Sequence, residues 1–123
     1  MSDPRLGTTQ ILLLAAYAGG MAGGQLLFKL AAERLTPGAG FAERLVELFG
    51  NAWFFAAFAL YCGLALAWVW ILTFTPLSRA YPFVALAFAI TPLLGAWVFA
   101  EPIGSRLVAG IVVIGIGLFL VVG

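Results

Sequence analysis

Residues 111–122 read IVVIGIGLFLVV, and residues 11–18 read ILLLAAYA. Neither stretch alternates apolar and polar residues, as the strands of a membrane β-barrel do. Both lie in longer apolar runs, and a helix needs about 20 apolar residues to cross the hydrocarbon core of a bilayer. The sequence therefore predicts an all-α membrane protein, a small bundle of four transmembrane helices in one domain (1–123). The predicted spans are about 8–32, 51–74, 80–100 and 106–122.

The composition of the 123 residues agrees with a membrane protein. Hydrophobic residues make up 64% and charged residues 9%, against about 45–50% and 25% in soluble domains. Six Lys and Arg against five Asp and Glu leave no basic stripe for nucleic acid. The absence of His and the single Cys remove most metal sites, His-based catalysis and an internal disulfide. We expect no enzyme, no catalytic residues, no metal, no cofactor and no nucleic-acid partner.

The connection between the first two predicted spans has its own pattern. Residues 37–40 read PGAG, a cluster that breaks helices, and residues 41–49 read FAERLVELF. The apolar residues of this second segment recur at i, i+4, i+7 and i+8, which predicts a short amphipathic helix at the membrane surface. A plain solvated linker is the alternative. The other two connections, around 76–79 and 101–106, are predicted to be tight turns.

The N-terminus and the orientation are less well determined. Arg5 followed by an apolar run resembles a signal peptide, but Asp3, Pro4 and the three further spans argue against cleavage. With a cytoplasmic N-terminus, Arg5 and Arg79 would lie inside. Arg34, Arg44 and Arg106 would then lie outside, a slight or reversed positive-inside bias. Either the N-terminus is outside or the topology is weakly determined, as an antiparallel dimer of dual topology would need.

Small residues and one proline mark helix contacts. In AAYAGGMAGG (15–24), glycines recur four residues apart, and two more glycines share a face of the last predicted span. This spacing lets helix backbones approach closely in lipid, although in the first span it could also leave room for a bulky ligand. Pro92 lies inside the third span and predicts a hinge or a static kink. The predicted packing residues are Gly19, Gly20, Gly23, Gly24, Gly110 and Gly117.

Two polar residues of the first span are candidates for ligand binding. Gln25 and Lys29 are four residues apart and therefore share one helix face. Ionisable groups at membrane depth are costly and usually face a cavity or a partner. A lysine suits a phosphate, and the amide can add a hydrogen bond to it or to a sugar hydroxyl. The alternative is that Lys29 extends to the interface and pairs with Glu33.

The remaining candidates lie near the ends of the predicted spans. Glu101, directly before Pro102, could cap a following helix, pair with Lys29 or hold a cationic substrate group. Arg79 could contact a lipid phosphate or act as an interface anchor, and the tyrosines could contact a ligand or anchor the helices at the interface. The predicted substrate-binding residues are Gln25, Lys29, Tyr61, Arg79, Tyr81 and Glu101.

Three segments carry a resemblance to a known family: GQLLFK (24–29), TPLSRAYPFVAL (75–86) and AEPIGSRLVAGIVVIGIGLFL (100–120). They resemble the EamA-like proteins of the drug/metabolite transporter superfamily. Within it they are most similar to the four-helix subunit type of the aminoarabinose-phosphoundecaprenol flippase. The shared pattern is Gly-Gln-x-x-x-Lys in the first span, Ala-Tyr-Pro at the start of the third, and Glu-Pro before a glycine-bearing fourth. The similarity covers all four spans and is weakest in 33–50.

This resemblance implies a multi-pass flippase of the bacterial inner membrane. Its substrate would be an undecaprenyl-phosphate-linked sugar, with or without an amine, or a related lipid. Its partner would be a second copy or a similar four-helix subunit, contacted through the last span. Lys29 and Arg79 would neutralise the phosphate, Gln25 and Tyr81 would hydrogen-bond the headgroup, and Glu101 would receive an amine.

Two other functions stay open. The small multidrug resistance family has the same size, but its proton-coupled members need a Glu in the first span. Met21 takes that position here, and Val84 replaces a tryptophan, although Tyr61 and Tyr81 do line up. An exporter of cationic drugs or metabolites is one alternative. A membrane subunit that stabilises a glycosyltransferase or carrier without transport is the other.

Overall fold

The computed structural model of the protein describes residues 7–122, and every regular element in that range is helical. Four segments are long and apolar enough to cross a membrane, and the third consists of three consecutive helical pieces. This confirms the predicted all-α, four-helix class. Asp3, Pro4 and Arg5 lie outside the described residues, and so do the predictions that depend on them. The elements are α1 (Thr8–Glu33), α2 (Phe41–Phe49), α3 (Ala52–Leu72), α4 (Leu77–Ala80), η1 (Tyr81–Phe83), α5 (Val84–Phe99) and α6 (Ser105–Val122).

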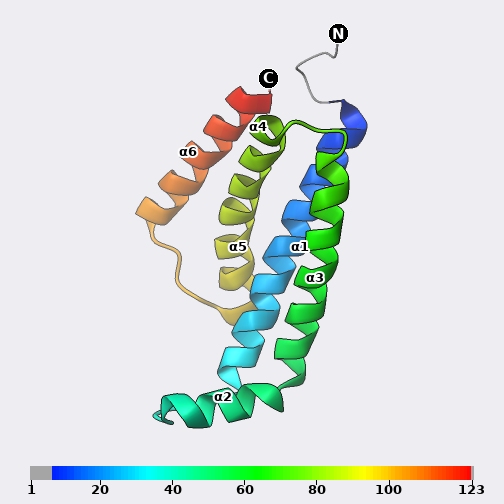
Figure 1. Cartoon of the computed structure of the whole chain (residues 1–123). Coiled ribbons are helices and arrows are strands. Elements are labelled where there is room, and N and C mark those ends of the chain that lie inside the picture. Colours follow the sequence, from blue (N-terminus) through cyan, green and yellow to red (C-terminus); the bar gives the residue numbers. More distant parts are fainter. Residues whose placement is uncertain (1–6, 123) are drawn as a thin grey trace.

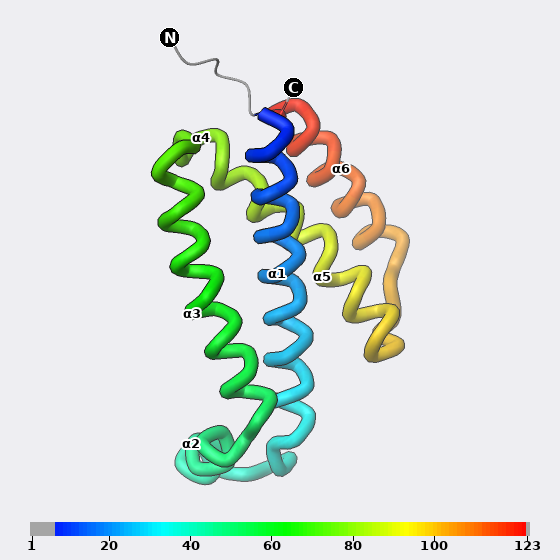
Figure 2. Tube along the Cα trace, turned by 90° about the vertical axis from the view of Figure 1, so that its right-hand side faces the viewer, coloured from blue at the N-terminus to red at the C-terminus, as the bar shows by residue number. Residues whose placement is uncertain are grey.

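Helix α1 is the centre of the bundle. It packs against α3 on one side and α5 on the other, and α6 packs against α5 (Figures 1 and 2). Successive spans run in opposite directions, so that α4 lies at the end where α1 begins and α6 finishes, while α2 lies across the opposite end.

Small side chains let α1 approach its neighbours. Leu14, Ala18 and Ala22 on α1 are fully buried at a spacing of four residues, and Ala57 of α3 is buried as well. The alanines at these positions allow close backbone contact, which drives helix association in lipid. A hydrophobic cluster of Leu14, Ile71, Ala80 and Phe83 packs at the end of the bundle that carries α4.

The predicted packing glycines of α1 divide into two faces. An added Cβ would lie 2.9 Å from Leu64 at Gly20 and 2.5 Å from Tyr61 at Gly24, so these two glycines do pack closely against α3. At the remaining four predicted positions an added Cβ meets nothing within 4 Å in the described chain, so they are not helix contacts within this subunit. These positions are Gly19, Gly23, Gly110 and Gly117.

The third span is not the single helix that the sequence predicts. It begins with the short helix α4, passes through the 3₁₀ turn η1 and continues as α5. Pro82 lies in this turn, and it has no N–H to donate to the carbonyl four residues earlier. Helix α5 then continues through Pro92, so the hinge stays a prediction. The connection to α6 occupies residues 100–104 and starts at Ala100 with a left-handed backbone (φ 54°, ψ 34°).

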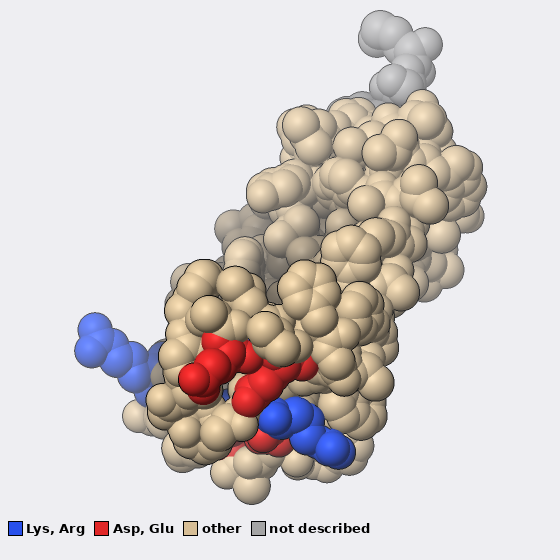
Figure 3. All heavy atoms as spheres, turned by 60° about the horizontal axis from the view of Figure 1, so that its bottom comes forward, with Lys and Arg blue, Asp and Glu red and all other residues tan. Residues whose placement is uncertain are grey.

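Charged side chains, acidic and basic, gather at the end of the bundle that carries α2 (Figure 3), although Arg79 lies at the other end. Helix α2 itself is amphipathic, and its apolar residues Phe41, Val46 and Phe49 are 73–80% exposed. This is the expected arrangement for a helix that lies in the interface between water and lipid.

Asn51 joins α1 to α3. Its Oδ1 accepts hydrogen bonds from the backbone N–H groups of Trp53 and Phe54 at 3.0 and 3.2 Å and so caps α3. Its Nδ2 donates to the carbonyl of Ala31 at the end of α1, at 2.9 Å. Because Asn51 is buried, both groups would lack partners without these contacts.

We expect Asn51→Ala to lower the free energy of unfolding by about 1–2 kcal/mol, since it removes a cap and a buried hydrogen bond. Asn51→Ser retains a capping oxygen and should lose less. Thermal unfolding of the detergent-solubilised variants, followed by circular dichroism, measures both. Equal midpoints for Asn51→Ala and the unchanged protein would contradict this role.

Candidate functional site

Two adjoining pockets lie between α1 and α5. Their volumes are about 220 Å³ and 330 Å³, and they share three residues in their walls. The smaller pocket contains the charged side chains and the larger one is mainly apolar. The shared residues are Gln25, Thr91 and Pro92; Leu26, Lys29, Gly95, Phe99 and Glu101 complete the smaller pocket, and Met21, Val84, Ala87 and Phe88 complete the larger.

Lys29 faces the smaller pocket together with Glu101. The Nζ atom of Lys29 lies 3.9 Å from Oε2 of Glu101, and the two side chains are 47% and 51% exposed. Lys29 thus pairs with Glu101 and not with Glu33. The capping hypothesis for Glu101 is wrong, because α6 begins only at Ser105. Because about half of each side chain is exposed in the described chain, a ligand or water can reach both charges.

Gln25 is oriented by a chain of hydrogen bonds. Its Nε2 donates to the hydroxyl of Tyr61 at 2.8 Å, and that hydroxyl donates to the carbonyl of Met21 at 2.8 Å. The Tyr61 ring also stacks on Phe28, with centroids 5.3 Å apart and planes 13° apart. The close approach of Gly24 to this ring makes room for it. Tyr61 therefore stands behind Gln25 and fixes the amide at the pocket wall.

Arg79 and Tyr81 lie at the other end of the bundle. Arg79 donates from Nη1 to the carbonyl of Val121 at 2.9 Å, where its cation also complements the C-terminal end of α6. Tyr81 is 60% exposed and meets Trp68 edge to face. Both residues belong to α4 and η1, opposite the end with α2 (Figure 1). The structure therefore corrects the predicted grouping, because these two residues do not join Lys29.

The sequence did not single out the α5 wall of the smaller pocket. Thr91, Gly95 and Phe99 are four residues apart and line this wall together. Their spacing places them on one helix face, and this spacing is the signal that could have identified them. Pro92, predicted only as a hinge, also lines both pockets.

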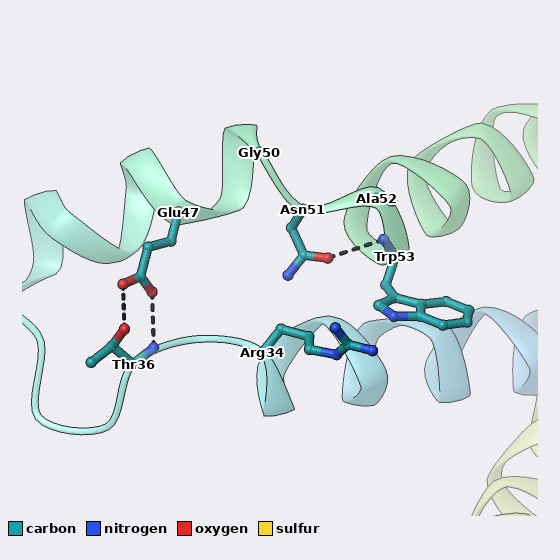
Figure 4. Close-up of a pocket in the computed structure, with 7 residues that line it drawn as sticks. All are labelled: Arg34, Thr36, Glu47, Gly50, Asn51, Ala52 and Trp53. Carbon is teal, nitrogen blue, oxygen red and sulfur yellow. Dashed lines mark hydrogen bonds between the residues drawn. The ribbon is translucent and has the colours of Figure 1, made fainter.

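A third pocket, of about 440 Å³, lies where α1, α2 and α3 meet (Figure 4). Both carboxylate oxygens of Glu47 accept hydrogen bonds from Thr36, from its backbone N–H at 2.9 Å and from its hydroxyl at 2.6 Å. These hydrogen bonds hold the pKa of Glu47 below its ordinary value. The carboxylate thus fixes the loop before α2 to that helix. The polar groups of this pocket therefore have a role in holding the fold together.

The fold and the smaller pocket define a class of protein. Four apolar helices cross the membrane, and one of them carries an amide and the chain's single lysine into a pocket beside a carboxylate. Ionisable groups within membrane spans mark binding sites and translocation pathways. These are the properties of a multi-pass membrane transporter.

The comparisons with known proteins identify the family. The chain is 32% identical over 102 residues to the probable 4-amino-4-deoxy-L-arabinose-phosphoundecaprenol flippase subunit ArnE of Sodalis glossinidius, covering 77% of this chain and 86% of the relative. Proteins of the same name from Pseudomonas paraeruginosa and Pseudomonas aeruginosa are 37% and 36% identical to this chain over 100 residues. Each match covers 79% of this chain and 83% of the relative. The chain belongs to the ArnE family of flippase subunits. No family model matches it, and no solved structure matches significantly.

We predict that Gly24→Ala destabilises the protein and that Gly23→Ala does not. The new methyl group at position 24 would overlap the Tyr61 ring, and overpacking of this kind costs about 1–3 kcal/mol. At position 23 the added Cβ meets open space. The unfolding midpoints of the two variants in the same detergent give the comparison, and equal midpoints would contradict the assigned contact.

Proposed function

We propose that this protein moves an undecaprenyl-phosphate-linked sugar between the leaflets of the bacterial inner membrane. The observation that carries the proposal is the placement of Lys29. It is the only lysine in the sequence, and its ammonium borders a pocket between two spans, beside Gln25. The printed names of the ArnE relatives support a lipid-linked sugar as the substrate class.

The chemistry of the pocket suits the polar part of such a lipid. The Lys29 ammonium offers three donors and a positive charge to a phosphate. The Gln25 amide, oriented by Tyr61, can hydrogen-bond the phosphate or a sugar hydroxyl. Glu101 can receive an amine, which an aminosugar such as the one named for the relatives would carry. The larger, mainly apolar pocket next to it can accept the start of the lipid tail.

We further propose that a second subunit, either another copy or a similar four-helix chain, completes the translocation path. Both pockets are open at the side of the bundle, so the headgroup would be only partly enclosed by one chain. Helix α6 buries none of its own residues in the described chain. Its face with Gly110 and Gly117 has room for close contact with another helix. The hinge at Pro92 would adjust the pocket wall during transport.

We expect Lys29→Ala to abolish transport while the protein stays folded. Loss of a charged hydrogen bond to phosphate costs about 1.5–3 kcal/mol, which is more than a tenfold loss of affinity. Transport of a fluorescent undecaprenyl-phosphate sugar across proteoliposome membranes, with the partner subunit present where transport needs it, measures the effect. Circular dichroism checks the fold.

Two matched variants make this experiment specific. Lys29→Arg keeps the cation and should retain measurable transport, whereas Arg34→Ala removes a cation that lines a different pocket and should have little effect. Full activity of Lys29→Ala would refute the assignment. Proton-driven efflux of organic cations that survives Lys29→Ala would favour a drug exporter. Copurification with a glycosyltransferase without any lipid binding would favour a stabilising subunit.

A further inference from the structure

Gly95 lies where the Glu101 carboxylate folds back onto α5. Gly95 is buried, and a Cβ added there would lie only 2.7 Å from Oε1 of Glu101. Real Cβ atoms essentially never come so close to another atom, so a side chain at position 95 would require the flexible end of Glu101 to move from this placement. Within the described chain, the atoms within 4 Å of that Cβ, apart from the local helix backbone, belong to Glu101. Packing against another helix therefore does not explain this glycine.

The backbone directs Glu101 to this position. Ala100 ends α5 with positive φ, which turns the chain sharply after the last helical residue. A non-glycine residue rarely adopts this conformation, which costs about 1–2 kcal/mol. After the turn, one carboxylate oxygen lies over Gly95 and the other lies 3.9 Å from the ammonium of Lys29. The carboxylate thus connects α5 to α1 across the smaller pocket.

We propose that Gly95 is a positioning residue: its lack of a side chain admits the Glu101 carboxylate into the pocket and so holds that carboxylate against Lys29. An anionic ligand that approaches Lys29 then competes with the Glu101 carboxylate for the ammonium. A side chain at position 95 would shift the carboxylate from this placement and so weaken its pairing with the ammonium. The effect on ligand anions rests on the proposed function, whereas the placement of Glu101 does not.

The single lysine allows the placement to be tested without a substrate. Acylation of Lys29 by an amine-selective ester, followed by peptide mass spectrometry, reports how far the carboxylate covers the amine. We expect Gly95→Ala and Glu101→Ala each to speed this reaction by about two- to fivefold, the range for loss of a half-exposed ion pair. The double variant should react like Glu101→Ala alone, because Gly95 acts through Glu101. Gly63→Ala, whose added Cβ meets nothing within 4 Å, is the matched control and should leave the rate unchanged.

The outcomes separate positioning from a merely structural role. An unchanged rate in Gly95→Ala, or a further increase in the double variant, would overturn the proposal. If Gly95→Ala folds only in the Glu101→Ala background, the clash with the carboxylate is supported. If it folds in neither background, the proposal is refuted.

A second measurement connects the placement to the function. Binding of undecaprenyl phosphate to the protein in nanodiscs should tighten by about two- to fivefold in Gly95→Ala, since an internal competitor is removed. A structural defect would weaken binding instead, and this result would contradict the proposed competition. If the unchanged protein binds no undecaprenyl phosphate, the proposed function fails, while the acylation experiment still decides the role of Gly95.

Discussion

The cost of holding an ammonium group near the hydrocarbon core is the constraint on which the site depends. Lys29 lies on a span that is otherwise almost free of charge, and such a group needs an anion or water within reach. Glu101 provides the anion, and an open pocket provides access to it. The sharp turn at Ala100 and the missing side chain at Gly95 bring that anion to the lysine. Several local features of α5 and its connection thus serve one charge pair.

The sequence predicts the fold well because membrane spans depend on local composition. Apolar runs of sufficient length identify all four spans, and the spacing of Gln25 and Lys29 places them correctly on one face of α1. The division of the third span follows from Pro82, whose effect on the helix was not anticipated. Pairing of Lys29 with Glu101 was one of several open alternatives, because it depends on a backbone turn that sequence spacing does not reveal.

The grouping of Arg79 and Tyr81 with Lys29 was the principal error, and the order of the spans explains it. A chain that crosses the membrane once between two residues places those residues on opposite sides. Lys29 lies near the end of the first span and Arg79 at the start of the third, so one intervening span places them at opposite ends. Arg79 instead binds the last turn of α6. The neighbours of Gln25 were also missed, since the Tyr61 bridge joins residues 36 positions apart.

The proposed contact between the Lys29 ammonium and the phosphate of a lipid can be measured directly, because the chain has a single lysine. In protein labelled with ¹⁵N-lysine and reconstituted with undecaprenyl phosphate, solid-state NMR can detect dipolar coupling between one side-chain nitrogen and the lipid phosphorus. We expect a coupling that corresponds to a direct ion pair, with nitrogen and phosphate oxygen about 2.7–2.9 Å apart, and its loss in Lys29→Ala. A lysine signal that shows no coupling to phosphorus when the lipid is bound would contradict it.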